Sequence, residues 1–226
     1  MNGTPLALGV AAGLVLASAL TRKPAGSRDR GIDRALILAL VEKLRVYTRD
    51  LIEEAEGDPD AKFDPEEYSV YKDDLERALG VPVLGWGDSR VVVRVAPGIV
   101  AKLPWREDGF ERNAAEVQLY EQASDEVKEM LLPPLDYIDP PGVSVFPEAK
   151  HFAFADSEDL RKRRWEWDDA RNRWLALVKS GKPGAVATDV WSSSNFGFYN
   201  GKLVLIDYEP EGGFNRVAKN RTKRRR

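Results

Sequence analysis

The spacing of apolar side chains divides the chain into helical and extended stretches. Over residues 33–56 apolar residues recur at helical intervals, which predicts an amphipathic helix. A second, shorter helix is expected over residues 65–79. Together they make a helical segment over residues 33–80, to which we assign packing rather than chemistry. The apolar face of the first helix is formed by Ile37, Leu40, Val41, Leu44 and Leu51.

After Gly80 the pattern changes to an alternation of apolar and polar residues that is rich in valine, which is typical of strands. Helices are expected over residues 111–123 and 156–180, and the turn Asn200-Gly201 indicates a last hairpin. This mixture of antiparallel strands and separate helices predicts an α+β fold. The predicted strands cover residues 81–84, 90–95, 99–103, 135–138, 143–146, 196–199 and 203–206.

The N-terminal end of the chain is apolar. Residues 5–20 carry no charged side chain, and the uncharged stretch extends over residues 1–21. This length suffices for one membrane-spanning helix, so we expect a membrane anchor, followed by a polar linker over residues 22–32. The basic residues of the linker predict an N-terminus outside a cell or virion membrane and a domain inside it. A cleaved signal ending near Ala17-Ser18-Ala19 and a buried helix are the alternatives.

The opposite end is strongly basic. Residues 216–226 hold seven basic and no acidic side chains, although the whole chain has 34 Lys and Arg against 37 Asp and Glu and a net charge of −3. The rest of the chain is therefore acidic. A basic block of this kind is either a solvated tail or a contact site for nucleic acid or anionic lipid, and both interpretations stand.

Composition narrows the chemistry further. The chain has no Cys and a single His among its 226 residues, which excludes disulfides, thiolate-bound metals, cysteine nucleophiles and metal sites built from several histidines. Six Trp, eight Phe and seven Tyr supply enough apolar surface for a folded core. The reactive groups that remain are carboxylates, amides, hydroxyls and lysines.

Five short motifs follow the predicted strands and helices in order. They are Ser89-Arg90-Val91-Val92, Val100-Ala101-Lys102, Arg112-Asn113 with Glu116, Asn195-Phe196-Gly197, and Leu203-Val204-Leu205-Ile206-Asp207-Tyr208. By this order and spacing, residues 83–209 resemble the protein-kinase-like fold, and more closely the short kinase-like proteins encoded by haloarchaea and their viruses. The resemblance covers a little over half of the chain. It implies a kinase-like domain over residues 81–215, with an antiparallel sheet in the N-terminal lobe and a truncated C-terminal lobe.

The resemblance implies a site for ATP and Mg²⁺. In that site Lys102, on the third strand, neutralises phosphates, and Glu116, fourteen residues later in a helix, holds the lysine in place through an ion pair. Lys102 could instead be a strand lysine that points to solvent. The turn with Gly85, Gly87 and Ser89 would cover the nucleotide, although a plain hairpin turn explains the same residues.

Asn195 and Asp207 flank the last hairpin, where the resemblance implies that they hold Mg²⁺ through an amide oxygen and a carboxylate. The alternative for Asp207 is a turn cap. Asp189 takes the place of the catalytic base, but it precedes Asn195 by six positions where kinases have five, and the neighbouring His and Arg are absent. Asp189 is therefore either a displaced base or a structural loop aspartate.

Two functions are compatible with these residues. The first is a membrane-anchored, kinase-like binding or scaffolding protein, a pseudokinase that binds ATP without catalysis. It would fit a viral virion or membrane component with protein partners in an assembly. The second is a small, active phosphotransferase that depends on ATP and Mg²⁺. The altered loop around Asp189 favours the first function.

Overall fold

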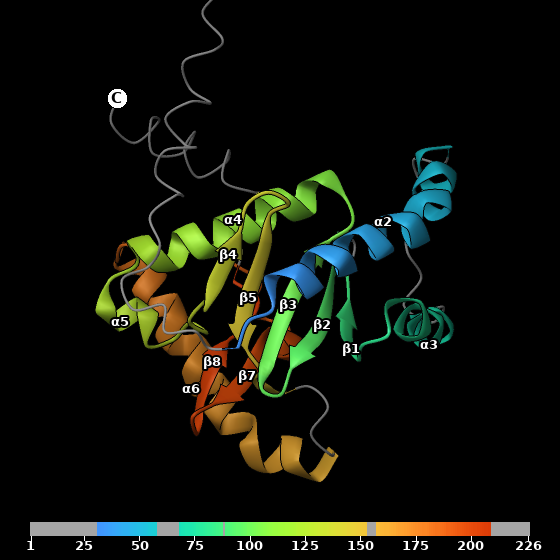
Figure 1. Ribbon diagram of the computed structural model, residues 1–226. Helices are drawn as coiled ribbons and strands as arrows, with labels where there is room; N and C mark the ends of the chain where they lie inside the picture. Colours follow the sequence, from blue (N-terminus) through green and yellow to red (C-terminus); the bar gives the residue numbers. More distant parts are fainter. Residues whose placement is uncertain (1–30, 58–67, 88, 153–156, 209–226) are drawn as a thin grey trace, which may run out of the picture. The chain divides into compact units, whose positions relative to one another are not determined.

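The computed structural model describes residues 31–57, 68–87, 89–152 and 157–208 of the chain (Figure 1). By its internal contacts the chain divides into two units, Met1–Gly31 and Ile32–Arg226, and the elements given below belong to the second unit. The predicted anchor over residues 1–21 and the basic residues 216–226 lie outside the described residues and stay predictions. Within the described ranges no helix is both long enough and apolar enough to cross a bilayer.

Five antiparallel strands form the larger of two sheets. They are β1 (Val83–Trp86), β2 (Arg90–Ala96), β3 (Ile99–Pro104), β4 (Asp136–Ile138) and β5 (Val143–Pro147), and their order in the sheet is β1-β2-β3-β5-β4. The strands predicted from alternation are confirmed. β1 begins two residues later than expected, because Pro82 has no N–H to donate to the strand pairing.

Alternation gives this sheet two different faces. On one side, which we call the helix-covered face, the side chains are apolar and fully buried: Val91, Val93, Ala101, Leu103, Val143 and Val145. The other side, which we call the cavity face, mixes apolar and polar side chains. Strand pairing places on it Arg90, Val92, Val100, Lys102, Ser144 and Phe146.

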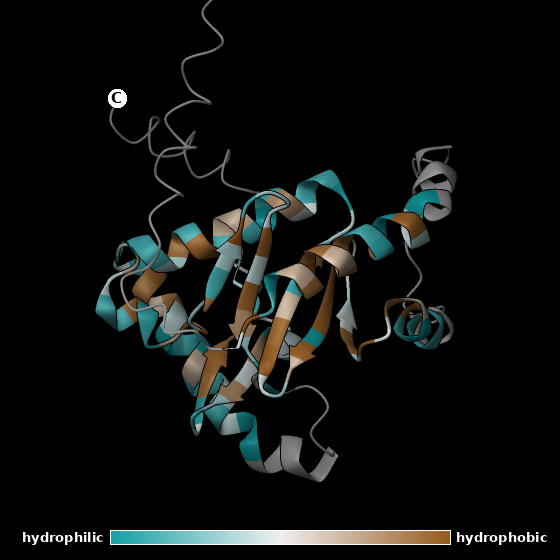
Figure 2. Ribbon diagram, in the orientation of Figure 1, coloured by the Kyte–Doolittle hydropathy of each residue, from teal (hydrophilic) through white to brown (hydrophobic). Residues whose placement is uncertain are grey.

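Helices α2 (Arg34–Gly57) and α3 (Tyr68–Leu79) close the helix-covered face. Figure 1 shows α2 crossing the larger sheet, and Figure 2 shows the hydrophobic residues of the strands beneath it. The helical period predicted for residues 33–56 is confirmed up to residue 49, since the buried positions there repeat every three or four residues; the side chain of Leu51 lies outside the described part. The side chains that pack on the sheet are Ile37, Leu40, Val41 and Leu44 from α2, with Leu75 and Leu79 from α3.

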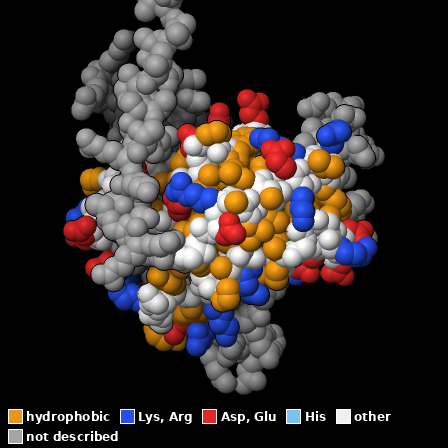
Figure 3. Space-filling model, in the orientation of Figure 1, with side chains coloured by type: hydrophobic (Ala, Val, Ile, Leu, Met, Phe, Trp, Pro, Cys, Tyr) orange, Lys and Arg blue, Asp and Glu red, His pale blue; other side chains and the backbone are white. Residues whose placement is uncertain are grey.

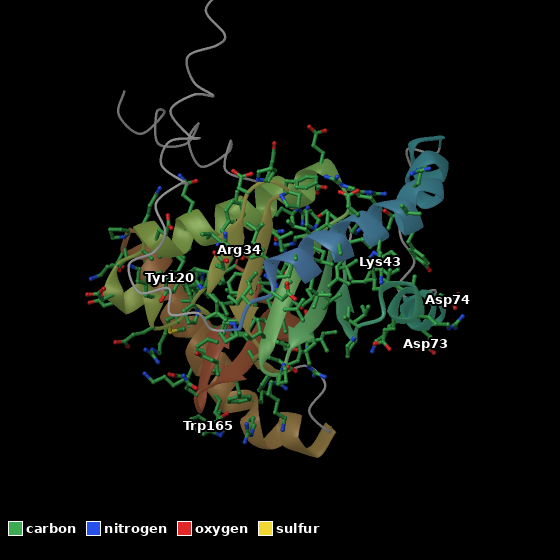
Figure 4. The ribbon with its side chains drawn as sticks, viewed as in Figure 1. Arg34, Lys43, Asp73, Asp74, Tyr120 and Trp165 are labelled. Atoms are coloured by element: carbon green, nitrogen blue, oxygen red, sulfur yellow. The ribbon has the colours of Figure 1, made fainter. Side chains whose placement is uncertain are left out.

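Two polar contacts fix the position of α2. The guanidinium of Arg34 donates to both carboxylate oxygens of Asp136 in β4, at 2.7 to 2.9 Å. Further along the helix, Lys43 Nζ donates to the carbonyl of Leu79 at the end of α3, at 3.1 Å. Figure 4 labels both side chains on α2, and Figure 3 shows charged side chains of both signs on this side of the molecule. The outer surface of α2 is therefore mixed, since Leu38 and Val46 are exposed beside its charged side chains.

The remaining elements form a second core. Helix α4 (Glu107–Gln122) and the short α5 (Asp125–Lys128) follow β3, and a three-stranded sheet contains β6 (Lys150–His151), β7 (Phe196–Tyr199) and β8 (Lys202–Leu205). Helix α6 (Ser157–Lys179) contacts β8, and Trp174 of α6 is fully buried. The predicted helices and the last hairpin are confirmed. α5 and β6 were not predicted, because elements of four and two residues are too short to show a period.

Leu40 and Leu38 test the role of α2, because they lie on the same helix with exposed fractions of 1% and 41%. We expect Leu40→Ala to lower the free energy of unfolding by about 2–4 kcal/mol, since it leaves a cavity against the sheet. The matched change Leu38→Ala should cost less than about 1 kcal/mol. Urea unfolding followed by tryptophan fluorescence measures both. Equal losses would contradict the packing of α2 on the sheet.

Candidate functional site

A cavity of about 640 Å³ opens on the cavity face of the larger sheet, and this size lies within the range of about 300–1,000 Å³ typical of small-molecule sites. Part of its wall is apolar and comes from the sheet and from the segments before β4 and after β8. These side chains are Leu84, Val92, Val100, Leu132, Phe146 and Ile206. The charged side chains of the wall are Arg90, Lys102, Arg112, Glu148, Lys150 and Asp207.

Lys102 and Glu116 form a buried ion pair beside the cavity. β3 turns Lys102 to the cavity face, where it pairs with Ser144 of β5, and α4 carries Glu116. The lysine Nζ lies 2.7 and 2.8 Å from the two carboxylate oxygens and donates to the carbonyl of Ile206 at 2.9 Å. Lys102 is 6% exposed and Glu116 is 0% exposed, so the solvent-pointing alternative for Lys102 does not hold.

Asn113, three residues before Glu116 in α4, ties the helix to the sheet. Its Nδ2 donates to the carbonyls of Lys102 and Gly142, both at 2.8 Å, and its Oδ1 accepts from Ser144 Oγ at 3.1 Å. The side chain is fully buried, and these contacts use three of its hydrogen-bonding positions. Asn113 thereby holds α4 at the distance from β3 at which Glu116 meets Lys102.

The chain that leaves β8 carries Asp207 to the same place. Leu205 accepts a backbone hydrogen bond from Leu132 at 2.9 Å, which joins β8 to the segment before β4. On the other side of Asp207, the hydroxyl of the buried Tyr208 donates to the carbonyl of Leu132 at 2.8 Å. Asp207 is therefore held between two anchored neighbours.

Arg90, the first residue of β2, contacts both carboxylates. Its Nη2 lies 2.8 Å from Asp207 Oδ1, and its Nη1 lies 3.3 Å from Glu116 Oε1 and 3.4 Å from Asn113 Oδ1. Lys102 Nζ approaches the same Asp207 oxygen to 3.5 Å. Arg90, Lys102, Glu116 and Asp207 thus form one network of two cations and two carboxylates, which we call the four-charge cluster.

The surroundings within the cluster shift the pKa values of its two acids in opposite directions. Burial raises the pKa of Glu116 to about 7, against the opposing effect of the nearby Lys102 and Arg90 cations. Loss of hydration also acts to raise the pKa of Asp207, but there the same two cations prevail, and the pKa lies below its ordinary value. Asp207 therefore stays ionised, whereas Glu116 takes up a proton near neutral pH.

The predicted glycine turn lies at the edge of the cavity, which is lined by Gly85, Gly87 and Ser89. The Gly87 N–H donates to the carbonyl of Arg90 at 2.9 Å, and the Ser89 carbonyl accepts from the Trp105 N–H at 3.0 Å. The indole Nε1 of Trp105 in turn donates to the Gly87 carbonyl at 3.1 Å. The two described sides of the turn are thus fastened to Arg90 and to Trp105 just after β3, and the Gly87 amide is already used.

Asn195 lines the cavity, whereas Asp189 is not among the described residues of its wall. Asn195 Nδ2 donates to the backbone carbonyl of Asp189 at 2.7 Å, and the Ile206 N–H donates to the Asn195 carbonyl at 2.8 Å. The Asp189 carboxylate is exposed and accepts from the backbone N–H groups of Trp191 and Ser192, at 3.1 and 3.3 Å. These are the contacts of a turn-stabilising aspartate.

The chemistry of the wall agrees with a nucleotide better than with Mg²⁺. An apolar surface beside buried cations suits a ring that carries phosphates. Of the predicted metal ligands Asn195 and Asp207, the second is already bonded to Arg90 and approached by Lys102. Mg²⁺ requires oxygen ligands at about 2.0–2.1 Å, and both cations would repel it. Among the described residues, no group of three or more His, Asp or Glu side chains is arranged to hold a metal ion.

Arg90 and Asn113 belong to two of the sequence motifs, but no role was predicted for either of them. Arg90 lies two positions before Val92, so the strand period places it on the same face. Asn113 lies three positions before Glu116, so the helix period places the two side by side. These two spacings indicate a role for Arg90 and Asn113 only once Lys102 and Glu116 are known to be in contact.

Comparison of the chain with family models, with curated proteins and with solved structures finds no match. The cavity and the side chains around it are therefore the basis for the function assigned below.

The raised pKa of Glu116 predicts a pH-dependent stability. The pKa rises from an ordinary 4.5 to about 7 on folding, so the native state binds the extra proton. The stability that this proton contributes is present at low pH and is lost as pH rises through 7. Between pH 5 and pH 7 we expect wild type to lose about 2 kcal/mol more than Glu116→Gln.

Urea unfolding at both pH values measures this difference. Glu111→Gln, at an exposed position of the same helix, is the matched control and should keep the wild-type dependence. Burial lowers the pKa of His151, which acts in the opposite direction but equally in all three proteins, so it cancels. Identical pH dependence in wild type and Glu116→Gln would contradict the raised pKa.

Proposed function

We propose that the chain is a kinase-like protein that binds a nucleoside di- or triphosphate and acts by binding rather than by phosphoryl transfer. The observation that carries this proposal is the change in the cavity wall from apolar to charged along β3. Val100 pairs with Phe146 of β5, and two residues further on Lys102 pairs with Ser144 and joins the four-charge cluster. Two strand residues span about 6.5 Å. This distance suits the separation between the base of a nucleotide and its phosphates.

The segment between the two sheets supports a base-binding role for the apolar end. After β5 the chain runs through Glu148 and Ala149 into β6, and these residues line the cavity. The Glu148 carboxylate is paired with Arg94 at 2.5 and 2.7 Å, which turns this side chain toward β2. The Glu148 N–H donates to the carbonyl of Gly98 at 2.8 Å, so a base that enters this end of the cavity would have to bond other backbone groups of the segment.

The order of the elements supports a kinase-like arrangement. A glycine turn, a strand with Lys102 and a helix with Glu116 come first, and a hairpin that ends in Asp207 comes last. The first two charged residues pair at 2.7 Å, and the third approaches the lysine to 3.5 Å. Residues separated by more than 100 positions thus meet beside the cavity, which supports the proposed nucleotide site.

Two contacts favour binding over catalysis. Asp207, the predicted metal ligand, is bonded to Arg90 at 2.8 Å. Asp189, the predicted base, accepts two backbone hydrogen bonds in its own loop, and no contact with the cavity is described for it. A base must reach the hydroxyl that it activates, and a carboxylate fixed in a turn is poorly placed to do so. These contacts weigh against the phosphotransferase alternative.

The two ends of the chain extend this proposal. An anchor over residues 5–20 and a basic tail over residues 216–226 would place the pocket between a membrane and an anionic partner. Binding of nucleotide would then stabilise the folded part of a scaffold, as in a membrane or virion component with protein partners. The bound ligand in this proposal serves the assembly and is not consumed.

The proposal predicts that nucleotide stabilises the protein. The full-length chain, with six Trp as intrinsic probes, is unfolded thermally with ATP, ADP, adenosine or inorganic triphosphate. At 100 times its dissociation constant a ligand adds about 2.7 kcal/mol to the free energy of unfolding. We expect ATP and ADP to raise the midpoint and the two fragments to do so less, because each fragment fills one part of the cavity.

Matched variants assign the effect to the cavity. In the double variant Lys102→Met with Glu116→Gln no unpaired charge is buried, and we expect it to fold but to lose the response to ATP and ADP. Lys202→Met changes an exposed strand lysine and should respond like wild type. Absence of any shift with ATP and ADP at millimolar concentration would refute the proposal. Phosphate transfer that Asp189→Asn abolishes would establish the phosphotransferase alternative in its place.

A further inference from the structure

Asp207 faces two cations that belong to the chain itself. Arg90 Nη2 lies 2.8 Å and Lys102 Nζ lies 3.5 Å from the same carboxylate oxygen. The Arg90 side chain is 9% exposed and that of Lys102 is 7% exposed. The two positive charges next to Asp207 therefore belong to buried side chains of the cavity wall and not to exposed side chains on the surface.

The position of Arg90 is determined by its neighbours. Strand pairing sets Arg90 opposite Pro104 at the end of β3, and its Nη1 lies close to Glu116 and Asn113. Asn113 is itself locked by its hydrogen bonds to the carbonyls of Lys102 and Gly142. A guanidinium held in this way cannot leave Asp207 without losing its other contacts as well.

In a phosphate-binding pocket, a divalent cation commonly joins a carboxylate of the protein to the phosphates of the ligand. A guanidinium can make the same connection, since it has five N–H donors in one plane and bonds carboxylates and phosphates alike. A metal ion at the Asp207 oxygen that Arg90 contacts would have to displace the guanidinium, and at either oxygen of this carboxylate it would lie close to the Arg90 and Lys102 cations. It would also leave Arg90 with Glu116, whose two oxygens already contact Lys102.

We propose that Arg90 takes the place of a divalent cation at Asp207, so that the pocket binds its nucleoside di- or triphosphate without metal. This inference rests on the proposed function and deepens it, because it states how the phosphates are neutralised. The chain supplies the bridging charge, and the affinity for nucleotide is therefore independent of Mg²⁺.

The first test needs no variant. Binding of ADP to the full-length protein is measured by calorimetry, once with millimolar MgCl₂ and once with EDTA, at the same ionic strength, since salt alone changes the attraction between charges. We expect the two dissociation constants to agree within about twofold. Because this comparison uses the wild-type chain, its result stands even if a variant of Arg90 fails to fold.

The second test changes the bridging residue. In Arg90→Gln the Asp207 carboxylate loses the closer of its two cations and keeps only Lys102 at 3.5 Å. We expect ADP to bind more weakly in EDTA and to regain at least about tenfold in affinity when Mg²⁺ is added. Arg112→Gln is the matched control, because Arg112 also lines the cavity but pairs with Asp108 at 3.1 Å. This control should weaken binding equally with and without Mg²⁺.

The outcomes are distinct. Wild-type binding that strengthens tenfold or more with Mg²⁺ overturns the proposal and leaves the nucleotide pocket intact. Equal responses of Arg90→Gln and Arg112→Gln to Mg²⁺ overturn the role of Arg90 specifically. Absence of ADP binding under both conditions refutes the proposed function, and this inference with it. Metal-independent binding in wild type, with Mg²⁺-dependent binding in Arg90→Gln, supports the proposal.

Discussion

The four-charge cluster is the interaction on which the rest of this structure depends. Four ionisable side chains from β2, β3, α4 and the segment after β8 meet beside one cavity, and three of them are almost fully buried. Burial of a charge is tolerated only when an opposite charge and hydrogen bonds compensate for it, and removal of one partner typically costs about 3–5 kcal/mol. The four elements therefore stabilise one another's positions. The cluster thus links the larger sheet to the smaller one by electrostatics as well as by packing.

The periodic elements could be predicted from the sequence because their signals are local. The alternation in residues 90–103 and the helical spacing of Ile37, Leu40 and Leu44 report which side of each element is buried, and the structure bears out both. The environment of Lys102 was more difficult to predict. A strand period gives the face on which a residue lies, but it does not tell whether that face meets solvent or protein. Its environment is set by Glu116 and by residues 206 and 207, more than 100 positions away.

The contacts of the site were also difficult to predict, because they join residues that are far apart in the sequence. Asp207 was expected to hold Mg²⁺ or to cap a turn; it lines the cavity, and its partner is Arg90, at a separation of 117 positions. Nothing in the neighbourhood of either residue indicates that pair. Asp189 shows the converse case: its distance in sequence from Asn195 suggested a role, and the actual contacts of its carboxylate are with the backbone two and three residues further on. These local contacts are those of a structural loop aspartate, whereas the sequence spacing alone left both alternatives open.

Helices α2 and α3, on the side of the sheet opposite the cavity, limit how far the chain can be shortened. The strands that carry Arg90 and Lys102 also carry Val91, Val93, Ala101 and Leu103, whose side chains are sheltered only where α2 and α3 lie over them. A fragment cut to begin at β1 would expose this row of aliphatic groups to water, and such surfaces drive chains to aggregate. We therefore expect any fragment that keeps the cavity to need α2 and α3 as well. Helices that do not line the cavity thus set the limit for truncation.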